Sequence, residues 1–109
     1  RADSIDVTNA EAIDQGRDKA IAAFGKIDIL VNNAGAVGTI GTVWEQPLEN
    51  WQHMLNLNLT SAFRCCRAIA PHMIANGYGR IVNMASNAGK MGIHSNSPYA
   101  AAKAGLITH

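Results

Sequence analysis

The sequence predicts an α/β fold in which parallel strands alternate with helices. Two short, apolar, β-branched runs at 27–31 and 80–85 are separated by a segment with helical periodicity, as parallel strands joined by crossovers require. Polar or small residues follow each run, and a third such cluster begins at Asp6. In parallel sheets ligands bind beyond the carboxyl ends of the strands. We therefore expect a functional site along this edge.

The composition is that of one small globular domain. The chain has 109 residues, of which 48% are hydrophobic and 16% are charged. A net charge of +1 offers no electrostatic basis for binding nucleic acid or an anionic membrane. No apolar run approaches the roughly 18 residues of a membrane-spanning helix. The chain begins with Arg1 and ends at His109 inside a predicted helix, so we expect a fragment of a longer protein.

The first helix is predicted from Ala10 to Phe24, after a possible strand end at residues 5–7. Thr8 and Glu11 have the spacing of a capping box, which predicts Thr8 as the N-cap. Gly25 is expected to end the helix. The apolar run that follows predicts a buried strand.

A long helix is predicted from about Leu48 to Ala75, after a glycine-containing loop over residues 36–45. Pro71 predicts a kink or a local break in this helix. An apolar stripe along it is interrupted by one amide, Asn58. The stripe consists of Trp51, Met54, Leu55, Asn58, Ala62, Cys65, Cys66, Ile69 and Met73.

Cys65 and Cys66 are adjacent, and neighbours on a helix do not face each other, so no disulfide between them is expected. No set of residues has metal-ligand spacing, and His72 is expected to be a polar surface residue. Two half-buried thiols suit a reducing cytoplasm.

The residues with the clearest chemistry are Ser86, Tyr99 and Lys103. Ser97 and Pro98 predict the start of a helix, on which Tyr99 and Lys103 share one face. A nearby ammonium and a helix N-terminus both lower the pKa of a tyrosine from its usual value of about 10. Tyr99 is thus a candidate general acid/base, and Ser86 a candidate hydrogen-bond donor to a substrate oxygen. The alternative is a surface tyrosine near a solvated lysine, which the clusters at the other strand ends make less plausible.

Five motifs follow one another in a characteristic order. They are Asp6-Val7-Thr8, Asp28-Ile29-Leu30-Val31-Asn32-Asn33-Ala34-Gly35, Asn58-Leu59, Gly79-Arg80-Ile81-Val82-Asn83 leading to Ser86, and Tyr99-Ala100-Ala101-Ala102-Lys103-Ala104-Gly105. Each motif alone is weak, but their order and spacing are specific. Together they resemble the central part of a short-chain dehydrogenase/reductase, and the likeness covers essentially the whole chain.

This resemblance implies a Rossmann-like, doubly wound parallel sheet, here limited to its central βα units. It also implies NAD(P)-dependent hydride transfer at a carbonyl or secondary alcohol. By that analogy Tyr99 exchanges the proton with the substrate oxygen, which Ser86 holds. Lys103 lowers the pKa of Tyr99 and bonds the nicotinamide ribose, and the resemblance implies that Tyr99 contacts the cofactor as well. Asn58 bends its helix locally and holds a water that links Lys103 to solvent; the alternative for Asn58 is a polar residue on the helix surface.

The cofactor contacts implied by the resemblance lie nearer the start of the chain. Asp6 contacts the adenine through its side chain, with Val7 beside the ring. Asn33 bonds the cofactor, and Ala34 and Gly35 let the backbone approach it closely. The alternatives are an ordinary turn for the glycine and a helix-terminus charge for Asp6.

Three departures from the family pattern limit what the resemblance implies. The glycine-rich turn after the family's first strand and the charged residue after its second strand are absent, and these bind pyrophosphate and select NAD or NADP. The cofactor is thus NAD or NADP, and we expect the chain to be inactive by itself. The substrate lid that the family carries after the position of His109 is also outside the sequence.

The resemblance implies a class of reaction, but it leaves more than one substrate class and more than one assembly surface open. The run from Tyr99 to Ile107 looks like that of 3-oxoacyl-[acyl-carrier-protein] reductases, with sugar and polyol dehydrogenases as the alternative. A nucleotide-binding homologue without catalysis is the alternative from another class. The family also implies a homotetramer, for which the long helix offers Ala62, Cys66 and Ile69, although these residues could equally face the sheet.

Overall fold

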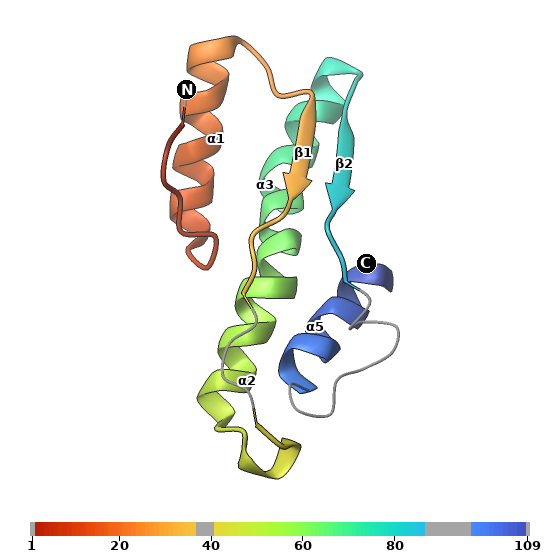
Figure 1. Cartoon of the computed structure of the whole chain (residues 1–109). Coiled ribbons are helices and arrows are strands. Elements are labelled where there is room, and N and C mark those ends of the chain that lie inside the picture. Colours follow the sequence, from red (N-terminus) through yellow and green to blue (C-terminus); the bar gives the residue numbers. More distant parts are fainter. Residues whose placement is uncertain (1, 37–40, 87–96, 109) are drawn as a thin grey trace.

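The computed structural model describes residues 2–36, 41–86 and 97–108, and it confirms the alternation of strands and helices (Figure 1). None of the helices within these ranges has the combination of length and apolar character needed to cross a membrane. In chain order the elements are α1 (Ala10–Phe24), β1 (Ile29–Asn32), the 3-10 turn η1 (Val43–Glu45), α2 (Leu48–Leu55), the π-helical turn η2 (Asn56–Thr60), α3 (Ser61–Asn76), β2 (Arg80–Asn83) and α5 (Ser97–Thr108).

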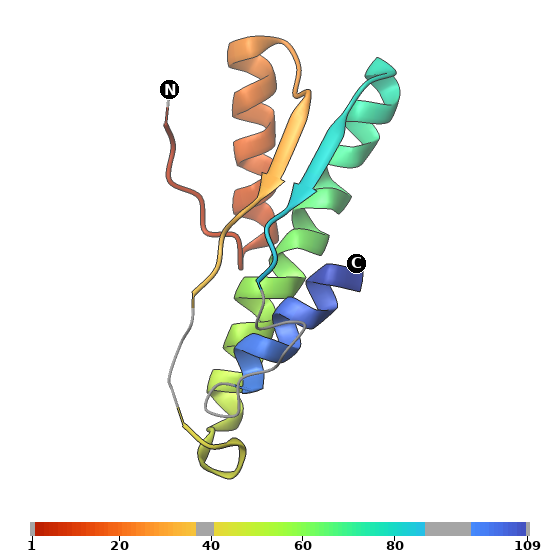
Figure 2. The same ribbon diagram turned by 45° about the vertical axis from the view of Figure 1, so that its right-hand side comes forward.

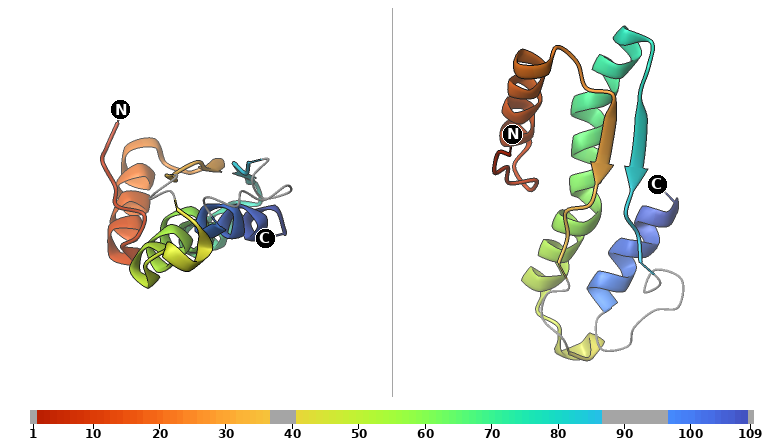
Figure 3. Two further views of the ribbon diagram at one scale, coloured as in Figure 1. Left: turned by 60° about the horizontal axis from the view of Figure 1, so that its bottom comes forward. Right: turned by 45° about the horizontal axis from the view of Figure 1, so that its top comes forward.

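β1 and β2 form a parallel pair with Ile29 opposite Arg80 and Asn32 opposite Asn83. Figure 3 shows α3 and α5 on one side of this pair. The opposite face is open, so Ile29 and Val31 are exposed while the alternating residues of β1 are half-buried. The prediction of a strand here is confirmed, but the prediction of a buried one is wrong, because a helix layer covers one face alone.

The bounds predicted for α1 are confirmed, but its N-cap is Asn9 and not Thr8. The Asn9 Oδ1 atom accepts hydrogen bonds from the backbone N–H groups of Glu11 at 3.0 Å and Ala12 at 3.2 Å. Asparagine is at least as good an N-cap as threonine, and Thr8 is engaged elsewhere. Gly25, with φ of 86°, ends the helix as predicted.

Residues 5–7 form no strand. Figure 2 shows this segment running back along α1 and away from β1. Ile5 and Val7 line, together with α1, β1 and α3, an apolar cavity of about 340 Å³. Strands pair at a separation of about 4.8 Å. The cavity lies between this segment and β1, and β1 pairs with β2.

The predicted long helix is interrupted at Asn56–Thr60 and not at Pro71. α3 continues through Pro71 to Asn76 and ends at Gly77 in the left-handed conformation, with φ of 68°. Proline removes one helical hydrogen bond, which leaves the carbonyl of Arg67 without its usual donor. Both Pro71 and Arg67 are exposed, so water can satisfy that carbonyl.

The predicted apolar stripe does face the interior, since none of its members is exposed. Ala62 and Ile69 are buried within the chain, and the Cys66 Sγ atom accepts a hydrogen bond from Asn32 Nδ2 at 3.6 Å. These three residues therefore face the sheet and are not available to a partner subunit. Cys65 and Cys66 are free thiols, and burial raises the pKa of Cys65.

His72 links α3 to the start of β1 through a hydrogen bond and is not the surface residue expected from the sequence. Its Nε2 atom accepts a hydrogen bond at 3.0 Å from the backbone N–H of Ile27, at the entry to β1. The bond joins α3 to the start of the strand and satisfies a half-buried donor.

Candidate active site

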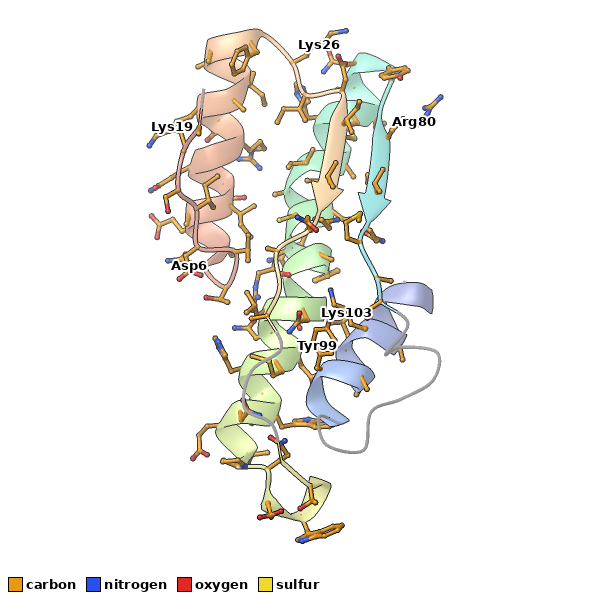
Figure 4. The ribbon with its side chains drawn as sticks, in the orientation of Figure 1. Asp6, Lys19, Lys26, Arg80, Tyr99 and Lys103 are labelled. Carbon is orange, nitrogen blue, oxygen red and sulfur yellow. The ribbon has the colours of Figure 1, made fainter. Side chains whose placement is uncertain are left out.

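A pocket of about 280 Å³ lies beyond the carboxyl ends of the strands, between the loop after β1, the turn η2 and the helix α5. In Figure 4, Tyr99 and Lys103 project from α5 toward the long helix at this level. Five residues predicted for the site line it, so the structure brings them together. The lining residues are Asn33, Gly35, Ala36, Asn58, Met84, Ala85, Tyr99 and Lys103.

Lys103 is a buried cation. Its side chain is 6% exposed, and Nζ donates a hydrogen bond to the Met84 carbonyl at 3.1 Å. Among the described residues no carboxylate forms an ion pair with it. Burying an unneutralised charge costs stability. Its position in a pocket suggests that the charge is kept for a function.

Tyr99 lies one helical turn before Lys103, as predicted. The Nζ atom is 5.7 Å from the centroid of the Tyr99 ring, within the range of a cation–π contact. The tyrosine is half-buried and lines the pocket. Its phenol therefore faces a cavity that holds a fixed positive charge.

Asn58 lies at the centre of the π-helical turn η2 and is 1% exposed. Its Oδ1 atom accepts a hydrogen bond from Ala36 N–H at 3.1 Å, and Nδ2 donates to the carbonyls of Ala36 at 3.0 Å and Met54 at 3.1 Å. The turn is the local distortion that the resemblance implied at this residue. The carboxamide thus fastens the long helix to the loop after β1.

Gly35 lets this contact form. A Cβ atom at position 35 would lie 2.4 Å from Asn58 Oδ1 and 3.5 Å from Lys103 Nζ. A separation under 3.0 Å is not tolerated, so any side chain here would displace the carboxamide. The glycine therefore shapes the protein side of the pocket, whatever it does for a ligand.

We expect Gly35→Ala to displace the Asn58 carboxamide, to slow any reaction in this pocket and to destabilise the intact protein by about 1–3 kcal/mol, the usual cost of overpacking. Steady-state kinetics and chemical denaturation measure the two effects. Gly41→Ala is the matched control, because a Cβ there meets its nearest atom, Gln46 Nε2, at an ordinary 3.7 Å. Equal kinetics for the two variants would contradict the expectation.

A sequence model of the family described as short chain dehydrogenase matches residues 2–109. The chain belongs to the short chain dehydrogenase family. It is 44% identical over 104 residues to a 2-dehydro-3-deoxy-L-rhamnonate dehydrogenase (NAD(+)) of Sphingomonas sp. (strain SKA58), covering 95% of this chain and 42% of that protein. It is 42% identical over 101 residues to a 3-oxoacyl-[acyl-carrier-protein] reductase of Synechocystis sp. (strain ATCC 27184 / PCC 6803 / Kazusa), covering 93% and 40%.

The fold of the chain is also that of solved short chain dehydrogenases. The structure of a metagenomic short-chain oxidoreductase in complex with NADP matches with a TM-score of 0.91 at 33% identity, covering 99% of this chain and 49% of that one. The predicted Rossmann-like α/β class is thus confirmed, as is the family. The chain spans about 40% of the length of the curated relatives it matches.

Ser86, the remaining predicted catalytic residue of this short chain dehydrogenase, follows Ala85 in the segment after β2. Ala85 lines the pocket with Tyr99 and Lys103, and Ser86 is half-buried. The structure therefore places Ser86 at the same edge of the sheet as the other predicted residues. The loop over residues 87–96, which the sequence predicts to lead into α5, lies outside the described residues.

Asp6, Val7 and Ala34 do not line this pocket. Figure 4 shows Asp6 on the far side of the loop after β1 from Tyr99 and Lys103. Val7 and Ala34 line the apolar cavity beside α1 instead. The predicted cofactor residues thus fall into two groups, one at the pocket and one toward the N-terminal segment, and Asn33 lines both cavities.

The Asp6 carboxylate is held by its neighbour. Its Oδ1 atom accepts hydrogen bonds from the Thr8 hydroxyl at 2.6 Å and the Thr8 N–H at 2.9 Å. Both bonds stabilise the ionised form, so they lower the pKa of Asp6. The turn fixes the direction of a negative charge at the end of the N-terminal segment.

We expect Thr8→Val to raise the pKa of Asp6, because the side-chain bond is the largest cause of its depression. A depressed carboxyl pKa adds stability above the unfolded value of about 3.9, and this stability is lost as pH falls through the folded pKa. The variant should therefore lose stability at neutral pH relative to low pH. An NMR titration of Asp6 checks the shift, and Thr8→Ser, which keeps the donor, should keep the low pKa.

Proposed function

We propose that this chain is the central part of a longer oxidoreductase that transfers a hydride between NAD or NADP and a carbonyl or secondary alcohol. One observation carries the proposal. The ammonium of Lys103 is buried in a pocket at the strand ends, one helical turn from a phenol that faces the same pocket. That pairing suits proton exchange at an oxygen atom undergoing reduction or oxidation.

The pocket fits one end of a dinucleotide. Its volume of about 280 Å³ holds a nicotinamide and ribose but not the whole cofactor, and Lys103 and Asn33 supply polar groups for ribose hydroxyls. Asp6 and Val7 would then meet the adenine end, outside the pocket. Ala34 and Gly35 would flank the path between the two ends. The cofactor, when bound, supplies or accepts the hydride.

The protein's own residues handle the proton. In the direction of reduction, the Tyr99 hydroxyl gives its proton to the substrate oxygen while Ser86 donates a hydrogen bond to the same atom. Lys103, as a fixed cation, stabilises the negative charge left on the phenol oxygen. Asn58 holds a water through which Lys103 exchanges protons with solvent. Oxidation of an alcohol runs the same steps in reverse.

The substrate we propose first is a 3-oxoacyl thioester on acyl carrier protein. Two likenesses support this substrate. The run from Tyr99 to Ile107 looks like that of 3-oxoacyl-[acyl-carrier-protein] reductases, and the chain as a whole is similar to the Synechocystis reductase. Sugar and polyol substrates are the alternative, favoured by the Sphingomonas sugar-acid dehydrogenase. A non-catalytic homologue is less well supported, because Ser86, Tyr99 and Lys103 are all retained together with Asn58.

A substrate panel distinguishes these possibilities. The purified intact protein is mixed with NADH or NADPH and a panel of 3-oxoacyl thioesters, keto-sugar acids and ketoses, and the absorbance of the reduced cofactor is followed. We expect its consumption with at least one member of the panel. Measurable cofactor binding without turnover on any carbonyl would favour the non-catalytic alternative.

We also propose a cytoplasmic homotetramer for the intact protein. Ala62 and Ile69 are buried inside the chain, so the contact surface on the long helix is more plausibly built around the exposed side chains of Phe63 and Ile74. Sedimentation velocity measures the assembly directly. A monomer at micromolar concentration would contradict this part of the proposal.

A further inference from the structure

Two of the buried polar side chains in the described part of the chain lie in the π-helical turn η2 and directly after it. Asn58 is 1% exposed and Ser61, three residues later, is 5% exposed. Asn58 lines both the pocket and the apolar cavity beside α1, whereas Ser61 lines the apolar cavity and not the pocket. A buried hydroxyl among apolar neighbours needs a partner and a reason.

The Ser61 side chain replaces a backbone hydrogen bond that the π-helical turn removes from the Leu57 carbonyl. In an α-helix the Ser61 N–H would donate to the carbonyl of Leu57, four residues back. Here it donates to the carbonyl of Asn56, five residues back, which is the π-helical pattern. The Ser61 hydroxyl donates instead to the Leu57 carbonyl, at 2.5 Å. One side chain thus supplies a donor where the altered ladder has removed one.

The π-helical turn sets the direction of the Asn58 side chain. Widening the helix by one residue changes the direction in which side chains leave the axis, and here the Asn58 carboxamide points at the loop after β1. If the turn relaxed to a regular α-helix, Asn58 would rotate away from Ala36. Gly35 leaves just enough room for the carboxamide as it stands.

We propose that Ser61 is a positioning residue for the reaction: its hydroxyl holds the π-helical turn open and thereby keeps the Asn58 carboxamide against Ala36. This inference rests on the proposed function for its kinetic consequence. Its structural part, the dependence of the Asn58 to Ala36 contact on Ser61, stands independently of any activity.

The first test is amide hydrogen exchange in the intact protein. Ala36 N–H is bonded to Asn58 Oδ1 and does not touch Ser61. We expect Ser61→Ala to speed exchange at Ala36 by about tenfold, which corresponds to losing one net hydrogen bond. Thr60→Val, which removes the neighbouring hydroxyl, is the matched control and should leave exchange at Ala36 unchanged. Unaltered exchange in Ser61→Ala would overturn the proposal.

The second test is a double-mutant cycle on kcat. We expect Ser61→Ala to lower kcat about tenfold in the wild-type background and to have no further effect once Asn58 is replaced by Ala. Equal losses in both backgrounds would show that Ser61 acts elsewhere and would also overturn it. Full activity of a Tyr99→Phe variant would instead refute the proposed function and leave the exchange result standing.

If Ser61→Ala fails to fold, Ser61→Cys carries the same two measurements, because a thiol is a weak donor of nearly the same shape. Its exchange and kcat should fall between wild type and the Asn58→Ala variant. Ser61→Thr keeps the hydroxyl and should restore both readouts to within about twofold of wild type. Wild-type exchange in the Cys variant would count against the proposal.

Discussion

Tyr99→Phe is expected to lower kcat of the intact protein by roughly a thousandfold, within the usual range for losing a positioned general acid. The substitution removes one oxygen atom and keeps the ring, so the packing of α5 and the cation–π contact with Lys103 should persist. Cofactor affinity should change much less than kcat, because the proton of the phenol acts on the substrate oxygen and the tyrosine ring is kept. Steady-state kinetics together with fluorescence titration of NADH or NADPH measure both quantities.

Tyr78→Phe is the matched control for that variant. Tyr78 is 49% exposed, and its ring lies 4.9 Å from the guanidinium of Arg80, which Figure 4 places near one end of the molecule and away from Tyr99. The same chemical change there should leave kcat at the wild-type value. If both variants retain full turnover, proton transfer by Tyr99 is refuted and the second class of function, nucleotide binding without catalysis, gains support.

Local sequence patterns were enough to predict the helices and the edge of the sheet that holds the pocket. Helical periodicity defined α1 to the residue, and Gly25 and Gly77 mark helix ends through a conformation that glycine adopts at low cost. The spacing of Tyr99 and Lys103 placed both on one face of α5. Each of these features depends on residues within a few positions of one another.

The features that the sequence did not predict depend on contacts between distant residues. The family resemblance implied a bend at Asn58, but it did not predict the hydrogen bonds from Asn58 to Ala36, 22 positions earlier, of which a helical stripe carries no sign. The bond from Ile27 to His72 spans 45 positions. Residues 5–7 form no strand and α3 has no break at Pro71, because pairing partners decide the first and solvent exposure decides the second.

The two groups of predicted cofactor residues illustrate how far motif order can go. The order of the motifs predicted that both Asp6 and Asn33 contact the cofactor. In the structure Asn33 lines the pocket, and Asp6 lies beyond the loop after β1. An extended ligand that runs along the strand ends reconciles the two positions. A small substrate alone would not. The separation is therefore what the proposed dinucleotide site requires of these residues, and the support for a dinucleotide is the likeness to relatives that use NAD or NADP.

Lys103→Met is expected to abolish most of the activity without weakening the fold. The variant keeps the length and much of the volume of the side chain but removes the charge. If Lys103 stabilises the phenolate and holds the ribose, kcat should fall by roughly a thousandfold, as for the loss of a general acid and its electrostatic support, and KM for the cofactor should rise. The Met84 carbonyl would lose its donor, which costs on the order of 1–3 kcal/mol.

That cost is set against the removal of a buried charge, for which the described residues provide no ion-pair partner. Replacing a buried charge by an apolar group of similar volume is often neutral or stabilising, so Tm should stay at or above the wild-type value. Lys26→Met is the control, because Lys26 is 58% exposed and pairs with Asp28 on the surface. A structural lysine at position 103 would behave in the opposite way: Lys103→Met would lower Tm and leave kcat of the folded fraction intact. Loss of activity with an undiminished Tm therefore separates a cation retained for chemistry from one retained for packing.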